Sequence, residues 1–389
     1  MKLTKLYKDF FKSESSSGIL LIIITISTLV IVNLILKEQY LGFWDNIFLG
    51  KSLLFWVNDV LMTLFFLLIG FEIEREIYVG ELSSIKKALL PIFAALGGMI
   101  VPALIYISFN YNTGSISGFG IPMATDIAFS LTILTIIASR IPSSLKIFLT
   151  AVAIIDDIGA IIIIAVFYTK GFSFLYLTIA LAIFLLLIVF NRKKIKNLLF
   201  YFIPAIFMWI CIYKSGIHPT VTGILLAFVI PFGKGDEKSI SYRLQHKLHK
   251  PVAYVILPIF AIANTGILIN SNDFANLLTL NSIGILLGLV IGKPLGITFF
   301  SWMAVKLKFC SLFENLKMKH ILGAGMVAGI GFTMSIFITL LAFDNGELVK
   351  ISKLSIILAS LLAATFSIIF FVATNKKKMK QEIINDENE

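Results

Sequence analysis

The chain has 389 residues, of which 58% are hydrophobic and only 14% charged, with a mean hydropathy of +0.95 and a net charge of +11. Because a soluble domain carries about 25% charged residues, this composition excludes a soluble enzyme, a disordered protein and a nucleic-acid binder. It indicates a protein surrounded mostly by lipid, in which a basic excess usually marks cytoplasmic loops. The two cysteines, Cys211 and Cys310, are too few for a disulfide framework.

Twelve segments are apolar enough to cross a membrane, which takes roughly 20 mostly apolar residues. In chain order they are 14–36, 53–76, 88–109, 118–139, 143–168, 173–190, 197–213, 217–232, 250–270, 281–305, 320–343 and 352–374. Short loops join them, so we expect an all-α polytopic membrane protein in which residues 1–389 form a single integral membrane domain. Its charged end, 376–389, is expected to be a cytoplasmic tail.

The distribution of Lys and Arg between the loops sets the orientation. With the N-terminus inside, the cytoplasmic segments hold 25 of these residues, the outer loops hold 6, and Arg75 and Lys293 lie within spans. An odd number of spans would break this alternation. The sequence therefore predicts that both termini face the cytoplasm.

Four charged residues stand deep within the expected spans, where a charge is costly and usually marks function. They are Asp126, the adjacent pair Asp156 and Asp157, and Lys293. Neighbours on a helix diverge by about 100°, so both adjacent aspartates can border one cavity. Buried carboxylates that repel each other can hold a hard cation or take up protons, and each state excludes the other. That competition is the minimum chemistry of a cation/proton exchanger. A purely structural pair is disfavoured because one lysine cannot balance three aspartates.

Two spans contain glycine-rich interruptions. Residues 118–122 of span four hold two glycines and a proline before Thr125-Asp126, and residues 323–331 of span eleven hold four glycines before Thr333. These spans run in opposite directions, which is the pattern of inverted repeats around a midplane site. The ends of broken helices carry partial charges, so we expect Asp126 to offset facing N-termini and Lys293 to offset facing C-termini. The alternative is that the glycines only permit close helix packing.

A third cluster lies at the inner end of span two, where Glu72, Arg75 and Glu76 share one helix face. It is either a solvated helix end or a charged, proton-sensing mouth. Three histidines stand near other span ends, and histidine titrates near neutral pH. They are His246 and His249 in the inner loop after span eight, and His218 at the outer end of span eight. Each alone is typical of an ordinary interfacial residue, and no spacing brings three metal ligands together.

Together these residues resemble the NhaA family of bacterial sodium/proton antiporters, over about residues 12–374. The motifs that carry the resemblance are Ala-Thr-Asp-Ile-Ala-Phe (124–129), Ala-Ile-Ile-Asp-Asp-Ile-Gly-Ala (153–160), Gly-Lys-Pro-Leu-Gly-Ile (292–297), Gly-Ile-Gly-Phe-Thr-Met-Ser (329–335), Phe-Glu-Ile-Glu-Arg-Glu (71–76) and Leu-Pro-Ile-Phe-Ala-Ile-Ala-Asn (257–264).

The resemblance implies twelve helices, with discontinuous spans four and eleven crossing near the midplane of a bacterial inner membrane. It implies electrogenic exchange of sodium or lithium for more than one proton, switched on at alkaline pH, for sodium and pH homeostasis. No enzymatic activity and no cofactor are implied, only the transported ions. The resemblance implies that Asp157 is the main cation ligand, with Asp156 beside it. It implies that Lys293 pairs with Asp156 and carries a proton. The other residues implied in ion binding and transport are Asp126, Thr125 and Thr333. Those implied in the pH response are Glu72, Arg75, Glu76, His218, His246 and His249.

Two departures from the family pattern affect regulation and assembly. Gln245 stands where family members often carry an acid before the first inner-loop histidine, so part of the pH response is expected to differ. The outer loop at about 37–52 looks short for the β-hairpin that pairs protomers in the family. The expected partners are membrane lipid, the transported sodium, lithium and protons, and a second copy of the chain in a homodimer.

Three other functions remain as alternatives. A sodium-coupled symporter of an organic anion would need a larger polar cavity and no lysine beside the acidic pair. An intramembrane aspartyl protease would need Tyr-Asp and Gly-x-Gly-Asp motifs on two helices, and neither motif occurs within the expected spans. A channel would not show saturable, obligatorily coupled exchange.

Overall fold

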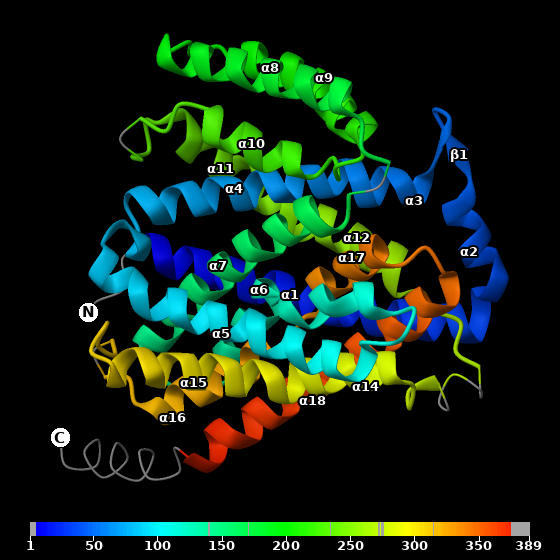
Figure 1. The fold of residues 1–389 in the computed structure, drawn as a ribbon, viewed down its shortest axis with the longest axis vertical. Coiled ribbons are helices and arrows are strands. Elements are labelled where there is room, and N and C mark those ends of the chain that lie inside the picture. The colour runs from blue at the N-terminus through cyan, green and yellow to red at the C-terminus, as the bar shows by residue number, and fades with distance from the viewer. Residues whose placement is uncertain are drawn as a thin grey trace. The chain divides into compact units, whose positions relative to one another are not determined.

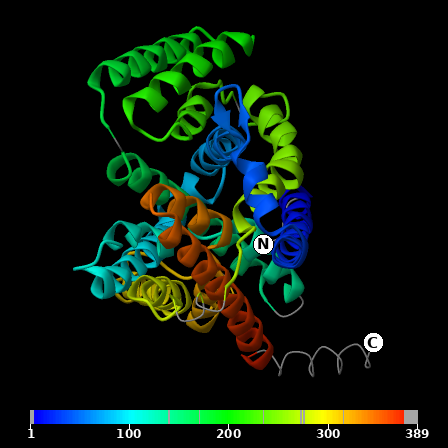
Figure 2. The ribbon, with the colours of Figure 1, turned by 90° about the vertical axis from the view of Figure 1, so that its right-hand side faces the viewer.

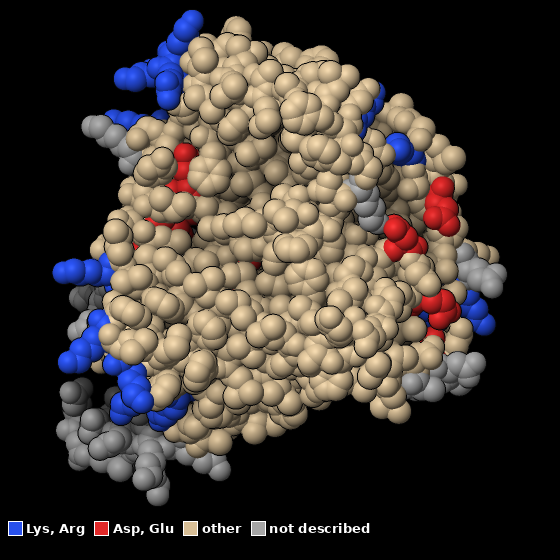
Figure 3. Space-filling model, in the orientation of Figure 1, with Lys and Arg blue, Asp and Glu red and all other residues tan. Residues whose placement is uncertain are grey.

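The computed structural model describes residues 5–374 except 139–140, 170, 234, 271–272, 274–275 and 314. The expected cytoplasmic tail at 376–389 lies outside the described residues. Most of the described chain is helical, and its sheet is a single two-stranded hairpin. Side chains other than Lys, Arg, Asp and Glu cover most of the face shown in Figure 3, as expected for a surface in contact with lipid.

The helices follow one another as long rods separated by short turns (Figure 1). The first part of the chain contains α1 (Lys5–Ile31), η1 (Val32–Leu36), α2 (Lys37–Asp45), α3 (Leu53–Phe55), η2 (Trp56–Leu61), α4 (Met62–Tyr78), η3 (Glu81–Ser83), α5 (Ile85–Asn110), η4 (Ile116–Met123), α6 (Ile127–Ile136) and α7 (Ser143–Phe167). The second part contains α8 (Phe174–Arg192), α9 (Leu199–Ser215), α10 (Val221–Val229), α11 (Ile240–Pro251), η6 (Val252–Ile256), α12 (Leu257–Thr265), α14 (Leu280–Leu287), η7 (Gly288–Gly292), α15 (Lys293–Lys306), α16 (Met318–Ala328), α17 (Phe332–Ala342) and α18 (Gly346–Thr374).

Ten of the twelve expected spans have counterparts among the described residues. Nine are helices, single or continued through a 3₁₀ or π turn, that are long and apolar enough to cross a membrane, and the tenth is the bent pair α16 and α17. The other two expected spans, 197–213 and 217–232, correspond to α9 with 17 residues and α10 with only 9. The chain is therefore an all-α membrane protein with many passes, while the count of twelve stays a prediction.

The helices gather into two compact units. Unit 1 comprises residues 1–22, 86–156 and 270–389, and unit 2 comprises 23–85 and 157–269. The expectation of a single domain over 1–389 remains a prediction. The expected ion-binding residues, except Asp157, fall within unit 1, whereas the expected pH-responsive residues all fall within unit 2.

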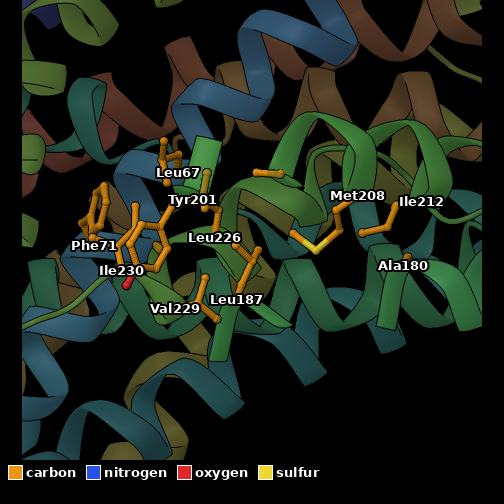
Figure 4. Close-up of a cluster of buried hydrophobic side chains, with 12 residues drawn as sticks. Leu67, Phe71, Ala180, Leu187, Tyr201, Met208, Ile212, Leu226, Val229 and Ile230 are labelled. Atoms are coloured by element: carbon orange, nitrogen blue, oxygen red, sulfur yellow. The ribbon is translucent and has the colours of Figure 1, made fainter. Parts of the chain in front are cut away.

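An apolar cluster forms the core of unit 2. Helices α8 and α9 lie side by side in Figures 1 and 2, and they pack with α10 and α4. Figure 4 shows the inward-pointing side chains of this cluster. The twelve buried residues are Leu67, Phe71, Ala180, Leu187, Tyr201, Ala205, Met208, Ile212, Leu226, Ala227, Val229 and Ile230. Close approach is possible because Gly223 of α10 lacks a side chain, and a methyl group there would lie 2.2 Å from the Thr63 carbonyl oxygen of α4.

Two glycines bring α5 and α15 together in unit 1. A methyl group on Gly97 would lie 2.2 Å from the carbonyl oxygen of Gly296, and one on Gly296 would lie 2.1 Å from that of Gly97. Both helices run side by side in Figures 1 and 2. The contact fixes the first turn of α15, which begins at Lys293, so small residues hold the buried lysine in place.

In the outer loop expected at 37–52, residues 37–45 are helix α2 and residues 47–52 form a hairpin, contrary to the expectation that the loop is too short for one. Strand β1 (Ile47–Phe48) pairs antiparallel with β2 (Lys51–Ser52). The turn is possible because Leu49 and Gly50 both take positive φ, at 49° and 78°, which is the geometry of the tightest hairpin turns. The pairing of two copies of the chain stays a prediction.

The two inner histidines lie on a helix, which corrects their placement in a loop. The chain becomes helical at Ile240, ten residues before the expected span, and the rod Ile240–Thr265 includes α11, η6 and α12. Hydropathy does not predict this earlier start, because α11 is polar and amphipathic. His246 is exposed on this helix and His249 is half-buried.

Candidate functional site

Two interrupted helices meet in unit 1. A 3₁₀ helix, η4, gives way to extended chain at Ala124 and Asp126 before α6 begins. Helix α16 ends at Ala328, and α17 continues from Phe332 after a bend of 52°. The two breaks touch directly, since the Asp126 N–H donates to the Ile330 carbonyl at 2.7 Å. Spans four and eleven are therefore discontinuous, as predicted, and their interruptions contact each other.

Asp126 caps the N-termini of two helices. Its Oδ1 accepts a hydrogen bond from the Phe129 N–H at 3.0 Å, in the first turn of α6. Its Oδ2 accepts from the Thr333 N–H at 3.0 Å and from the Thr333 hydroxyl at 2.5 Å, in the first turn of α17. The first N–H groups of a helix lack partners within it and carry partial positive charge. A single carboxylate therefore satisfies both helix ends, as the sequence predicted.

A serine that the sequence analysis did not single out completes the cap of α17. Ser360 of α18 accepts a hydrogen bond from the Phe332 N–H through Oγ at 3.2 Å. No sequence signal marks Ser360, because it lies within an apolar span and has no charge. Its role follows only from the position of α18 beside the break.

Lys293 lies in a fully buried polar triad. Its Nζ is 2.5 Å from Asp156 Oδ2, and both side chains are 0% exposed. The same ammonium donates to Thr125 Oγ1 at 2.7 Å. Thr125 Oγ1 in turn lies 2.8 Å from Asp156 Oδ2 and 3.0 Å from the Ala328 carbonyl, and its single proton can serve either acceptor. The expected pairing of Lys293 with Asp156 is present. Lys293 approaches the C-terminal end of α16 through Thr125.

The α7 carboxylates differ in their surroundings. Asp156 and Asp157 are consecutive and buried, at 1% and 2% exposed. Asp156 uses Oδ2 for Lys293 and Thr125, whereas its Oδ1 is buried and has no hydrogen-bond partner among the described residues. A buried oxygen of this kind is unfavourable unless a proton or a cation completes its shell. Asp156 therefore has one occupied and one available oxygen.

The charged end of α4 contacts α11 within unit 2. The Arg75 guanidinium lies 5.3 Å from the ring centroid of Tyr242. Tyr242 stacks on His246, with ring centroids 6.2 Å apart and planes 3° from parallel. On the same helix end, Glu76 Oε2 accepts a hydrogen bond from the Glu81 N–H at 2.9 Å. The structure thus links Arg75 to His246 through an aromatic ring, a link that spacing along the sequence does not reveal.

His218 belongs to a different cluster. Its Nε2 lies 3.3 Å from Asp59 Oδ1, and its Nδ1 lies 2.8 Å from the Thr220 hydroxyl. Asp59 and Arg75 are 16 residues apart on one helical rod, or about 24 Å at the rise of a helix. The structure therefore separates His218 from the α4 and α11 group.

Two further acidic residues of unit 2 were not singled out from the sequence. They are Asp59, the partner of His218, and Glu74, which is 4% exposed. Both stand inside the expected span 53–76, so the cost of a charge within an apolar span would have identified them. Glu74 was passed over because it lies in a motif whose other charges appeared solvated.

Known proteins resemble this chain over nearly its whole length. A family profile described as Na+/H+ antiporter 1 matches residues 8–371. The Na(+)/H(+) antiporter NhaA 1 of Flavobacterium johnsoniae is 55% identical over 379 residues, covering 97% of this chain and 100% of the relative. The Na(+)/H(+) antiporter NhaA of Flavobacterium psychrophilum is 55% identical over 388 residues, covering 100% of both chains. That of Cytophaga hutchinsonii is 52% identical over 386 residues, covering 99% of this chain and 100% of the relative.

Proposed function

This chain belongs to the NhaA family of sodium/proton antiporters, and we propose that Asp156 and Asp157 bind the transported cation in competition with protons. Exchange of sodium for protons is the activity of the chain as a member of that family. The proposal adds the residues, the order of events and the regulation. The single observation that supports it best is the buried Asp156–Lys293 pair, in which one carboxylate oxygen of Asp156 has no partner among the described residues.

The two carboxylates supply oxygen ligands, which suit a hard cation such as sodium or lithium. Asp157 is the main ligand, and Asp156 Oδ1 is a second. A cation at Oδ1 withdraws negative charge from Asp156 and weakens its attraction for Lys293. Protonation of either carboxylate removes a ligand charge. One site therefore holds a cation or protons, but not both, and this exclusion couples the two fluxes.

Lys293 provides the extra proton. With Asp156 ionised and in contact, the buried ammonium is stabilised by an opposite charge. When a cation takes over Asp156, that stabilisation falls and the ammonium can release its proton, which returns when the cation leaves. More than one proton then moves for each cation, so each cycle transfers net charge. Thr125, which contacts both partners, keeps them aligned during the exchange.

Asp126 and Thr333 have a supporting part in the proposal. Their contacts hold the N-termini of α6 and α17 at the break. A neutral side chain in place of Asp126 would leave two positive helix ends facing each other. We assign these residues to the geometry and electrostatics of the crossing, and the carboxylates of α7 to the ion itself.

The pH response is assigned to the inner group of Glu72, Arg75, Glu76, His246 and His249. His246 stacks on Tyr242, and Arg75 lies over the same ring, so this group connects the charged end of α4 to α11. His218 pairs separately with Asp59, and we assign this pair to the pH response as a second contact. The chain lies in the bacterial inner membrane with both termini in the cytoplasm, exports sodium, and carries out no covalent chemistry.

Everted membrane vesicles test the overall function. A preset pH gradient is monitored on addition of sodium, lithium or potassium, across about pH 6.5–8.5, where histidines change charge. Sodium and lithium should collapse the gradient with saturation, and more strongly at the alkaline end. Collapse by sodium only when an organic anion is present would instead indicate a symporter, and a non-saturating response would indicate a channel.

Replacement of Asp157 tests the assignment of the ligand. Asp157→Asn keeps the shape of the side chain and removes its charge, so the protein should remain in the membrane at wild-type level while sodium-driven proton movement disappears. Asp45→Asn, at the exposed end of α2, is the matched control and should transport normally. Retained exchange with unchanged apparent sodium affinity in Asp157→Asn would overturn the assignment.

A further inference from the structure

A second site lies in unit 2, and its lining includes neither carboxylate of α7. A cavity of about 800 Å³ opens where the ends of α4, α8, α10 and the start of α11 meet. Its wall includes five exposed cationic side chains, one buried acid and several apolar side chains. The cationic residues are Arg192, Lys194, Lys196, Lys238 and Arg243. Lys and Arg side chains gather at this end of α8, at the upper left of Figure 3.

The buried acid is Glu74 of α4. It is 4% exposed, and its Oε2 has no hydrogen-bond partner among the described residues. A buried carboxylate oxygen without a partner is costly, and this one lines a cavity instead of closely packed protein. The site therefore offers one acceptor on its wall and several cationic donors at its rim. A ligand that fits both must carry a cationic N–H donor as well as an anionic group.

The position of the cavity points to a lipid. The apolar rods Leu53–Tyr78 and Phe174–Arg192 both end at its wall, which is the depth of the phospholipid head groups if these rods cross the membrane. Tyr78 and Phe232 contribute adjacent rings, with centroids 5.0 Å apart, and aromatic residues concentrate at that depth. Basic pockets at the ends of spans are known to suit lipid phosphates.

The wall is held by hydrogen bonds of its own, so the cavity does not depend on a ligand to form. Asn191 Nδ2 donates to the Val229 carbonyl at 2.9 Å and ties α8 to α10. In the following loop, Ser239 Oγ donates to the Asp236 carbonyl at 2.5 Å and Ser241 Oγ to the Phe232 carbonyl at 3.4 Å. A preformed pocket avoids part of the ordering cost of binding.

From these features, we propose that this cavity binds an aminophospholipid, a lipid whose head group carries both a phosphate and a primary ammonium. The phosphate lies among the cationic side chains of the rim, and the ammonium donates to Glu74. The apolar wall receives the glycerol and the first carbons of the acyl chains. A phosphatidylglycerol head group has no ammonium and leaves Glu74 without a partner. A phosphatidylcholine head group has a quaternary ammonium with no N–H to donate. The proposal is independent of the ion-binding assignment.

Lipid retention by the full-length protein tests the proposal. Native mass spectrometry in detergent compares phosphatidylethanolamine with phosphatidylcholine and phosphatidylglycerol of the same acyl chains. The wild type should retain phosphatidylethanolamine about tenfold better than either, since a charge-assisted hydrogen bond is stronger than a neutral one. Equal retention of the three lipids, or preference for phosphatidylglycerol, would overturn the proposal. So would release of the lipid by millimolar inorganic phosphate, which would identify a soluble anion as the ligand.

Three variants locate the site. Glu74→Gln should reduce the preference for phosphatidylethanolamine over phosphatidylcholine, because a neutral amide oxygen is a weaker acceptor for an ammonium than a carboxylate is. Arg243→Gln should weaken retention of all three lipids. Glu347→Gln, an exposed acid at the start of α18, is the matched control and should retain the wild-type preference. A preference as strong in Glu74→Gln as in the wild type places the lipid elsewhere and overturns the assignment. If Glu74→Gln fails to fold, N-methylated forms of the lipid make the same test on the wild type, since each methyl group removes an N–H donor.

Discussion

The crossing in unit 1 and the apolar cluster in unit 2 are equally buried but are held together by opposite means. At the crossing, helices are interrupted, and side-chain oxygens of Thr125, Asp126 and Ser360 bind backbone groups that the breaks expose. In the apolar cluster, the helices α4, α8 and α9 are uninterrupted where they pack, and twelve buried side chains fill the space between them. Continuous helices satisfy their own backbone, so the apolar cluster needs no charge.

The difference shows where function can lie in an apolar solvent. An interrupted helix in lipid is tolerated only where its freed groups find partners or line a cavity. The partners at the crossing are titratable or can bind ions, and the same groups that satisfy the fold can exchange a proton for a cation. The apolar cluster offers stability alone. Substitutions in the two regions should therefore separate stability from ion affinity.

The largest effect is expected from Lys293. Lys293→Ala removes the ammonium that pairs with the buried Asp156 carboxylate. The free energy of unfolding should fall by about 3–5 kcal/mol if both groups are shielded from water, and by less if Asp156 becomes protonated. We expect a lower melting temperature in detergent, and any residual exchange in proteoliposomes should have lost its response to an imposed voltage. An exchange rate that follows voltage as in the wild type would place the extra proton on another residue.

Lys293→Arg sharpens this test. Arginine keeps the positive charge but is not deprotonated in proteins, so it can restore the pairing with Asp156 without releasing a proton. Stability should recover at least in part, while the response to voltage should stay lost. Recovery of both would mean that Lys293 acts only as a structural partner.

A smaller effect is expected from Asp126. Asp126→Asn keeps one acceptor oxygen but replaces the other with an amide that cannot accept from Thr333, and it removes the charge that faces two helix ends. The expected loss of stability is about 1–3 kcal/mol, accompanied by slower sodium-driven proton movement. Ser130→Ala, which removes only a 3.2 Å hydrogen bond to the Val327 carbonyl, is the control. If the two variants behave alike, the double cap has no special role.

The smallest effect is expected in the apolar cluster. Ile212→Val removes one buried methylene, with an expected cost of about 0.5–1.5 kcal/mol. The melting temperature should fall slightly, and the apparent sodium affinity and its pH dependence should not change. A shift of sodium affinity as large as that of Asp126→Asn would break the distinction between the two regions.

Much of the crossing could be predicted from the sequence because its signals are chemical. Charges such as Asp126 and Lys293 stand out against an apolar background, and glycines mark the breaks. The contacts that join them could not be predicted, although the family resemblance placed Thr125 at the site. The bridge through Thr125 and the cap by Ser360 depend on which helices meet, and neutral hydroxyls are common in apolar spans.

Helix ends were the weakest part of the sequence analysis. The polar start of α11 and the hairpin β1–β2 were missed because hydropathy detects only what is buried in lipid. Glu74 and Asp59 were missed for a different reason. They lie near the two ends of the apolar rod Leu53–Tyr78, where a charge is usually solvated. Only the structure shows that Glu74 is buried and that Asp59 pairs with His218.

The central claim is that a cation and protons compete for Asp156 and Asp157, and the apparent sodium affinity as a function of pH tests it most directly. Sodium-driven proton movement is measured in proteoliposomes over a range of sodium concentrations at each pH. The account predicts that the sodium concentration for half-maximal rate rises steadily as the pH falls, by about tenfold per pH unit for each proton that the cation displaces, where the site is mostly protonated. A half-maximal concentration that is independent of pH across the active range would contradict it.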